Sequence, residues 1–458
     1  MQEGGDVTTE HDGQTPARVP KAANHAGEDP RTAGLTRDWS WTEPTVWTAR
    51  MLAALEQGVK GGKWYSLIDK VQSETTLREA FAQVAANQGA AGVDHVSVEH
   101  FARDKDANVR RLSEELRRGI YRPQQIRRHY IPKPGSTEMR PLGIPTVRDR
   151  VVQTALRMVI EPIFERDFAA HSYGFRPNRG CKDALRRMHE LLKVGHVFIV
   201  DADLKSYFDT IPKDRLMALI RQKVVDTRVL ALIESFLNQG VLDGDKEWVP
   251  EQGTPQGAVV SPLLSNIFLN PLDHLMAERG FEMVRYADDF VVMCRNLEDT
   301  TAALALVKEW TASVGLILHP TKTRLVDERK DGFDFLGYHF EAGKRWPRAK
   351  SRKKLRDTIR AKTKRTSGQS MTQIIADVSR TLRGWFEYFK HSVPPTFPIE
   401  DGFVRRRLRS ILRKQSHRRG SAKANGADQS RWPNAYFTAL GLFCLEHAHT
   451  AACQSSRR

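Results

Sequence analysis

The spacing of apolar residues along the first 200 positions alternates between helical and extended patterns. Apolar positions recur every three or four residues, as on one face of a helix, at 75–89, 107–119, 149–168 and 182–192. Glycine closes the first two stretches, which is typical of helix ends. Between the second and third stretches, residues 126–145 carry two short β-type runs joined by a Pro-Gly-Ser turn. The pattern predicts helices packed beside a two-stranded ribbon.

The next stretch continues this mixture of helices and strands. A short apolar strand at 196–200 is followed by helices at 212–238, and a glycine-rich connection leads into another helix. Residues 282–294, EMVRYADDFVVMC, read as strand, turn and strand, and a helix is expected at 299–314. Helices and strands are interleaved without a regular βαβ period. We therefore predict an α+β fold with an antiparallel sheet.

The two ends of the chain differ from this central part. Residues 1–45 contain few apolar positions and are predicted to form a disordered tail. Near Arg345 the composition becomes basic and helical, which indicates a second structural unit. We expect three segments: the tail, a body at 46–340 and a basic helical domain at 341–458.

Positive charge is concentrated at the C-terminal end. The net charge is +17, and residues 341–458 contain 27 Lys and Arg against 8 Asp and Glu. The remaining residues contain 45 basic and 47 acidic side chains. A local excess of this kind is typical of a surface that binds a polyanion such as nucleic acid. No long amphipathic helix supports an anionic membrane as the partner.

No stretch is apolar enough for a membrane span, and the N-terminus lacks the apolar core of a secretory signal. We expect a soluble, intracellular protein. The four cysteines form no disulfide framework. Cys444, His447, His449 and Cys453 have ligand types at metal-like spacing. A terminal amphipathic helix with incidental ligand types is the favoured alternative, and the sequence leaves both open.

Acidic residues follow two of the predicted strands. Asp201 and Asp203 lie at the end of one apolar strand, and Asp288 and Asp289 lie in the turn of the 282–294 hairpin. If the strand ends are neighbours, the carboxylates of Asp203, Asp288 and Asp289 converge and raise one another's pKa. A divalent cation such as Mg²⁺ would relieve that repulsion. The alternative is that Asp-Asp is ordinary turn chemistry.

The order of the motifs favours the first interpretation. The chain reads IPKPGSTEMRPLGIP, SYGFRPNRGCKDAL, DADLKSYFD, GTPQGAVVSPLLSNIFL, RYADDFVV and FDFLGYHF. This succession resembles the reverse transcriptases encoded by bacterial group II introns, over roughly residues 75–340. LRGWFEYFK and RWPNAYFTALGLF resemble the thumb and maturase-specific region of the same family. The resemblance implies a right-hand polymerase with fingers and palm, followed by an α-helical thumb and maturase domain.

The resemblance also assigns roles to individual residues. Asp203, Asp288 and Asp289 match the catalytic carboxylates that hold two Mg²⁺ ions, and the backbone of Leu204 would also face a metal. The nucleotide site would comprise Lys133, Arg140, Phe208, Gln256 and Gly257, with Phe208 at the position that crowds a ribose 2′-hydroxyl. Asp209 is interpreted as a turn or helix-capping residue.

The basic C-terminal residues are expected to contact nucleic acid: Lys353, Lys354, Arg356, Arg360, Lys364 and Arg365. Four aromatic residues nearby can stack bases or fill a helical core, and core packing is favoured: Trp385, Phe386, Tyr388 and Phe389.

The family implies an RNA-directed DNA polymerase that also binds intron RNA and assists splicing and retromobility. Its partners would be group II intron RNA, an RNA template with a DNA primer, dNTPs and target DNA, in the bacterial cytoplasm and at the nucleoid. The expected relatives are the endonuclease-lacking, class C-like members. Two alternatives stay open: an RNA-binding splicing factor without polymerase activity, and a domesticated reverse transcriptase in phage defence or diversity generation.

Overall fold

The computed structural model describes residues 38–132, 139–416 and 425–455. Most of the predicted N-terminal tail, residues 1–37, lies outside this range. Residues 38–45 belong to the packed structure, because Trp39 is buried and its indole Nε1 donates to Glu56 Oε1 at 2.8 Å. Thr42 is buried as well. The packed part of the chain therefore begins before residue 45.

Helices form the N-terminal part of the body. The elements are α1 (Ala49–Gln57), the single-turn η2 (Lys60–Gly62), α2 (Ile68–Val71), α3 (Glu74–Ala86), α4 (Val98–Arg103), α5 (Lys105–Arg117) and α6 (Val147–Glu165). Helix α3 buries Leu77, Phe81 and Val84, the apolar face that its sequence predicts. Helix α6 is buried along almost its whole length and packs on α3, so it is the central helix of this part.

A four-stranded sheet joins two segments that are distant in sequence. It contains β1 (Ile126–Pro132), β2 (Met139–Ile144), β4 (Val241–Asp243) and β5 (Lys246–Trp248), in the order β2-β1-β4-β5. The predicted ribbon is present as the antiparallel β1–β2 pair, whose turn lies outside the described residues. Strand β4 pairs in parallel with β1. Helices α8 (Tyr207–Thr210), α9 (Lys213–Arg221) and α10 (Thr227–Leu237) connect this sheet to the next.

The second sheet carries the acidic residues. Its strands are β3 (Phe198–Asp203), β6 (Glu282–Tyr286), β7 (Asp289–Cys294) and β8 (Arg324–Asp327), in the fully antiparallel order β6-β7-β3-β8. Alternate side chains face opposite layers. One face packs on α11 (Ser261–Glu278) and α12 (Leu297–Val314), and the other packs on α7 (Cys181–Lys193). Because both faces are covered, most side chains of β3, β6 and β7 are apolar; Asp201 and the fully buried Arg285 are exceptions inside the strands.

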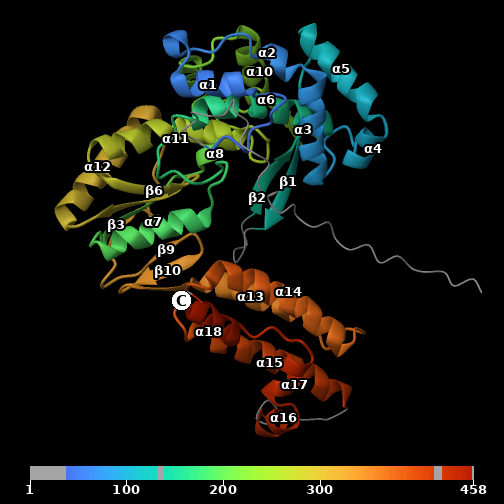
Figure 1. Cartoon of the computed structure of the whole chain (residues 1–458), viewed down its shortest axis with the longest axis vertical. Coiled ribbons are helices and arrows are strands. Elements are labelled where there is room, and N and C mark those ends of the chain that lie inside the picture. The colour runs from blue at the N-terminus through green and yellow to red at the C-terminus, as the bar shows by residue number, and fades with distance from the viewer. Residues whose placement is uncertain (1–37, 133–138, 417–424, 456–458) are drawn as a thin grey trace, which may run out of the picture.

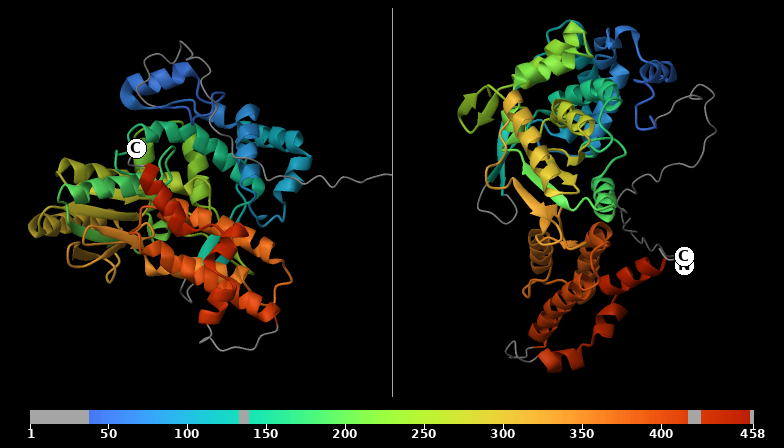
Figure 2. Two further views of the ribbon diagram at one scale, coloured as in Figure 1. Left: turned by 60° about the horizontal axis from the view of Figure 1, so that its bottom comes forward. Right: turned by 90° about the vertical axis from the view of Figure 1, so that its left-hand side faces the viewer.

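The C-terminal helices form a separate body beneath the two sheets (Figures 1 and 2). A small sheet of β9 (Phe333–Phe335), β10 (Tyr338–Glu341) and β11 (Lys344–Pro347) precedes them. The helices are α13 (Ala349–Lys362), α14 (Met371–Phe389), α15 (Thr396–Gln415), α16 (Asn425–Arg431), α17 (Asn434–Ala439) and α18 (Leu445–Ser455). All of them except α16 contribute side chains to a separate apolar core.

Helix α14 connects the C-terminal body to the small sheet. Phe389 is buried against Tyr338 of β10, and the Tyr338 hydroxyl donates to the Tyr388 carbonyl at 2.6 Å. Phe386 is buried in the helical core, and Trp385 packs on both clusters. These aromatic side chains therefore fill cores, as favoured from the sequence. Within the described residues, no helix is long and apolar enough to cross a bilayer.

Candidate active site

Three aspartates meet at one end of the β6-β7-β3-β8 sheet. Asp203 is the last residue of β3 and lies directly opposite Asp289, the first residue of β7. Asp288 lies in the turn between β6 and β7. From the sequence, the convergence of these aspartates depended on the two strand ends being neighbours. In the structure they are neighbours in the sheet.

The environment disfavours negative charge on two of these aspartates. Asp289 is exposed at the strand end, but desolvation by the surrounding protein and the charges of Asp288, Asp201 and Asp203 raise its pKa to about 7. Burial, and next the charge of Asp203, raises the pKa of Asp288, while Arg140 on β2 acts in the opposite direction. Like charges held close together have this effect, and a bound cation reverses it.

A buried arginine holds the turn that carries Asp288 in place. Arg285 is completely buried and donates to both carboxylate oxygens of Asp273 on α11, at 2.7 and 2.5 Å. Its Nη1 also donates to Asn266 Oδ1 and to the carbonyl of Ala287, both at 2.9 Å. A bidentate pair fixes orientation as well as distance. Arg285 therefore ties the backbone of the turn to helix α11.

The SYGFRP segment supports the same turn. Asn266 Nδ2 donates to the carbonyl of Gly174 at 2.8 Å, and the backbones of Tyr173 and Arg285 are hydrogen-bonded at 2.9 Å. Ala287 has a left-handed φ of +61°. A Cβ on Gly174 would lie 2.2 Å from the Ala287 nitrogen, so only glycine permits this approach. The strained turn persists because three segments hold it.

A lysine that the sequence analysis did not identify reaches the site. Lys322 Nζ donates to Asp203 Oδ2 at 2.6 Å, and the His319 amide donates to the Asp203 carbonyl at 2.7 Å. Lys322 follows α12 in an irregular segment without a periodic pattern, so no local signal marks it. Asp201 pairs instead with Arg324 at 3.1 Å.

The donor set fits a divalent cation that substrate oxygens help to bind. Among residues 38–132, 139–416 and 425–455, no three His, Cys, Asp or Glu side chains form a ready-made metal site, and this includes the three aspartates. Mg²⁺ is usually held by one or two carboxylates together with substrate phosphates and waters. The facing carboxylates of Asp203 and Asp289 meet that requirement. On the side that faces Leu318, the Asp203 carbonyl accepts from the His319 amide, and the Lys205 amide donates to the Ile317 carbonyl. The Leu204 carbonyl lies between these two bonds and therefore points away from Leu318.

The predicted nucleotide-site residues lie around the same end of the sheet, apart from Lys133, which lies outside the described residues. The Gln256 carbonyl accepts from the Gly143 amide at 2.6 Å, which ties the GTPQG loop to β2. Gly257 has a φ of +105°, and a Cβ there would lie 2.3 Å from the Gly143 oxygen. Phe208 is half-buried and its ring meets that of Phe175 edge-on.

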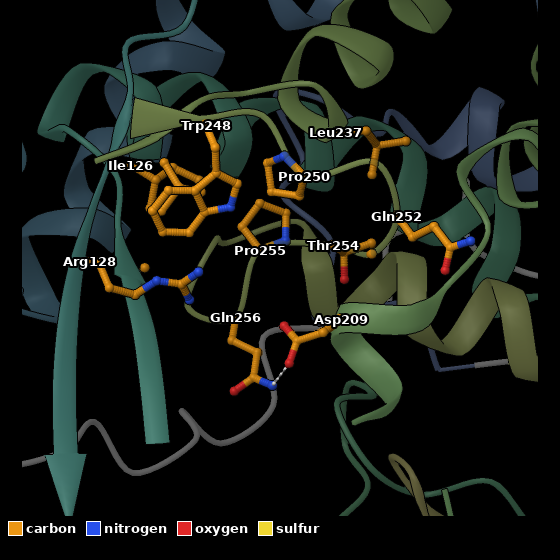
Figure 3. A pocket seen from close by; sticks show the side chains of 13 residues that line it. Ile126, Arg128, Asp209, Leu237, Trp248, Pro250, Gln252, Thr254, Pro255 and Gln256 are labelled. Carbon is orange, nitrogen blue, oxygen red and sulfur yellow. Dashed lines mark hydrogen bonds between the residues drawn. The ribbon is translucent and has the colours of Figure 1, made fainter. Parts of the chain in front are cut away.

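Asp209 lies in the single helical turn α8 and does not cap the next helix, so of the two roles predicted from the sequence the turn holds and the cap is wrong. The cap of the following helix is Pro212, which has no side-chain hydrogen bond of this kind. The carboxylate of Asp209 instead accepts from Gln256 Nε2 at 3.4 Å (Figure 3). The aspartate therefore faces the GTPQG loop.

The six basic residues of α13 and its C-terminal end differ in their surroundings. Arg356 is bound by the buried carboxylate of Glu400 at 2.8 Å, so its charge is largely used inside the domain. Arg360 pairs with Asp357 and lies over the Phe403 ring. The other four are exposed: Lys353, Lys354, Lys364 and Arg365.

The Cys/His group near the C-terminus is used in packing. Cys444 Sγ donates to Asp401 Oδ2 at 3.1 Å, and the His449 ring stacks on Phe397 with centroids 4.4 Å apart. Cys453 contacts the ring of His449. Leu445 of α18 is buried in the helical core, and within the described residues no three His, Cys, Asp or Glu side chains are grouped so that they could hold a metal ion.

Comparisons with known proteins cover both parts of the chain. Residues 131–340 match the family model "Reverse transcriptase (RNA-dependent DNA polymerase)", and residues 352–431 match "Group II intron, maturase-specific domain". Protein YkfC of Escherichia coli K12 is 32% identical over 344 residues, covering 66% of this chain and 85% of YkfC.

Two further matches are more partial. The group II intron-encoded protein LtrA of Lactococcus lactis subsp. cremoris is 37% identical over 201 residues, which are 43% of this chain and 33% of LtrA. A solved telomerase from Candida albicans aligns over 67% of this chain and 64% of its own, with 12% identity and a TM-score of 0.38. The reverse transcriptase domain implies RNA-directed DNA polymerase activity. On the two family-model matches and the match to YkfC, together with the α+β polymerase fold and its helical C-terminal region, the chain belongs to the group II intron reverse transcriptase and maturase family.

Proposed function

We propose that this protein copies RNA into DNA at the three-aspartate site, and that it binds its intron RNA to assist splicing and retromobility. The observation that carries the proposal is the register of Asp203 with Asp289, with Asp288 in the turn that Arg285 holds. Three rigidly placed carboxylates at one sheet end are what metal-assisted phosphoryl transfer requires.

Asp203, Asp288 and Asp289 would hold two Mg²⁺ ions. When bound, the ions would lower the pKa of the primer 3′-hydroxyl and neutralise the charge of the departing pyrophosphate. Lys322 donates a hydrogen bond to Asp203 in this structure. It would move to a substrate oxygen once the Asp203 carboxylate binds Mg²⁺. Arg140 is a fixed cation near enough to affect the pKa of Asp288, and it would bind phosphate oxygens of the incoming nucleotide.

The remaining residues of the site would select and orient the nucleotide. Phe208 would crowd a ribose 2′-hydroxyl and so favour dNTPs, with Phe175 supporting its ring. The backbone at Gly257 allows close approach of the loop to β2, which would position Gln256 beside the sugar.

The helical domain, residues 341–458, would grip nucleic acid through its exposed basic side chains. Lys353, Lys354, Lys364 and Arg365 are suited to phosphate contacts, because they are exposed, whereas Arg356 is bound to the buried Glu400. Structured RNA is bound largely through shape and backbone, which fits such a surface. Group II intron RNA and target DNA are the partners that this proposal names.

Primer extension on an RNA template with Mg²⁺ tests the polymerase proposal. Asp289→Asn keeps the shape of the side chain and should reduce incorporation of dNTPs at least about a hundredfold. The matched control is Asp201→Asn, on the same strand but paired with Arg324. Equal extension by Asp289→Asn and the parent would show that the site is assigned wrongly.

A further inference from the structure

Segments that are distant in the sequence meet around Tyr388, near the C-terminal end of α14. Figure 1 shows α7 and strands β9 and β10 between the sheet of the aspartates and the C-terminal helices, and side chains from all of these elements share one apolar cluster. Tyr286, the last residue of β6, and Tyr388 are both half-buried at the edge of that cluster. The cluster therefore reaches from the C-terminal helices to the β6–β7 hairpin that carries Asp288 and Asp289, here called the aspartate hairpin.

The hydroxyl of Tyr388 supports a strained turn. The turn between β9 and β10 has left-handed φ angles of +46° at Leu336 and +84° at Gly337. Such an angle is an outlier for a side chain as bulky as leucine. The Tyr388 hydroxyl donates to the Leu336 carbonyl at 2.7 Å, and the Ser351 hydroxyl of α13 donates to the Gly337 carbonyl at 2.9 Å. The C-terminal helices therefore hold both residues of this turn.

Cys181, the first residue of α7, connects Tyr388 to the aspartate hairpin. Its thiol is hydrogen-bonded to the hydroxyls of both Tyr286 and Tyr388. A phenol has one proton, and that of Tyr388 goes to the Leu336 carbonyl. The thiol must then donate to Tyr388 and accept from Tyr286. The result is a continuous chain of hydrogen bonds, which runs through Tyr286, Cys181, Tyr388 and the Leu336 carbonyl.

The chain ends beside the turn that carries Asp288. Tyr286 pairs with Asp289 in the antiparallel register of β6 and β7. Arg285 ties the same turn to α11. The chain through Cys181 adds a link from the aspartate hairpin to α14 and to the β9–β10 turn. Networks of directed hydrogen bonds can couple distant elements in this way, so a shift of the C-terminal helices would reach the aspartates.

We propose that Tyr388 and Cys181 are positioning residues of the three-aspartate site, which hold the aspartate hairpin in register with the C-terminal helices. The inference rests on the proposed polymerase function, in which those helices grip nucleic acid while the aspartates act on the primer end. A displacement of about 1 Å between reacting groups can cost about a hundredfold in rate. Loss of the chain should therefore lower the rate of nucleotide addition and leave the affinity for primer–template unchanged.

Single-turnover extension by the full-length protein on an RNA template, at saturating dNTP, tests the proposal. Cys181→Ala and Tyr388→Phe each remove one member of the chain and should lower the rate constant about tenfold. Cys181→Ser keeps a donor and an acceptor and should retain at least about half of the parental rate. The matched control is Tyr436→Phe on α17, which also removes one phenolic hydroxyl but lies outside the chain.

The double variant Cys181→Ala with Tyr388→Phe distinguishes one shared chain from two independent effects. Because both changes break the same chain, the rate constant should fall about tenfold, whereas independent effects would multiply to about a hundredfold. The melting temperature and the dissociation constant for primer–template are measured on the same proteins. A structural role alone would lower the melting temperature and leave the rate constant of the folded protein unchanged.

Hydrogen–deuterium exchange measured by mass spectrometry reports the coupling without catalysis. The peptide that spans residues 283–291 should exchange faster in Tyr388→Phe than in the parent, because the aspartate hairpin loses its link to α14. The same peptide in Tyr436→Phe should exchange at the parental rate.

The outcomes separate this inference from the polymerase proposal. Parental rate constants and parental exchange in both Cys181→Ala and Tyr388→Phe overturn the positioning role, even when the parent extends primers. Faster exchange of the aspartate hairpin in a protein that extends no primers supports the hydrogen-bond chain and overturns the polymerase function. Weaker binding of primer–template at an unchanged rate constant also overturns the positioning role, because it places Tyr388 and Cys181 in the nucleic-acid surface.

Discussion

Substitutions of Arg285 can separate an effect on stability from an effect on catalysis. This one buried side chain pairs with Asp273 and also holds the turn that carries Asp288. Arg285→Met removes the charge and leaves the Asp273 carboxylate buried without its partner. Breaking a buried ion pair in this way costs about 3–5 kcal/mol. The same change removes the donor to the Ala287 carbonyl, a charge-assisted bond that contributes about 1.5–3 kcal/mol. The single variant should therefore lose both stability and activity.

The double variant Arg285→Met with Asp273→Leu separates the two effects. Replacing both members of a buried pair by apolar residues is often neutral for stability. The turn would still lack its tie to Arg285, and a displacement of about 1 Å at the reacting groups can cost about a hundredfold in rate. We expect the free energy of unfolding to recover to within about 1 kcal/mol of the parent, while primer extension stays low.

The assay combines urea denaturation with single-turnover extension on an RNA template. The prediction concerns the rate constant at saturating dNTP, since the dNTP-binding residues are unchanged. If the double variant regains the parental rate together with its stability, Arg285 only stabilises the fold and does not position Asp288. That result would refute the account of the turn.

Three further outcomes follow from other parts of the molecule. Burial raises the pKa of Glu161 to about 7 from its ordinary 4.5, so the unfolded chain ionises this group first and stability falls as pH rises from 4.5 to 7. Glu161→Gln should therefore stabilise the protein by up to about 3 kcal/mol at pH 8 and by little at pH 4.5, measured by urea denaturation; an equal effect at both pH values would contradict this. Gly174→Ala should reduce extension strongly through the clash with Ala287, whereas Gly384→Ala, with open space around its Cβ, should not. Neutralising Lys353, Lys354, Lys364 and Arg365 together should weaken binding of intron RNA and reduce the slope of log K against log salt by up to about 3; an unchanged slope would show that these residues do not contact phosphates.

The hairpin at 282–294 illustrates what the sequence makes predictable. Its alternating apolar arms predict two buried strands, and the structure has them as β6 and β7 with Asp288 in the turn. The α+β fold and the family are confirmed. The roles of the three aspartates and of the nucleotide and RNA contacts stay predictions, although the sheet register brings Asp203 and Asp289 face to face.

Contacts between segments that are distant in the sequence could not be predicted from the local pattern of residues. Lys322 reaches Asp203 from 119 residues away, and Arg285 depends on partners in α11 and on the carbonyl of Ala287. The β4–β5 hairpin was also missed, although its Asp-Gly pair at 243–244 is a recognised turn signal, because each strand has only three residues. Arg356 was predicted to contact nucleic acid, and only the fold shows that Glu400 binds it.

The central claim is that the three aspartates form one metal-dependent catalytic centre. Electron paramagnetic resonance can count Mn²⁺ ions bound to the protein in complex with a dideoxy-terminated primer, an RNA template and the matching dNTP. The account predicts two ions for the parent and for Asp201→Asn, and at most one for Asp203→Asn and Asp289→Asn. Two ions bound with parental affinity in Asp203→Asn and Asp289→Asn would contradict the account.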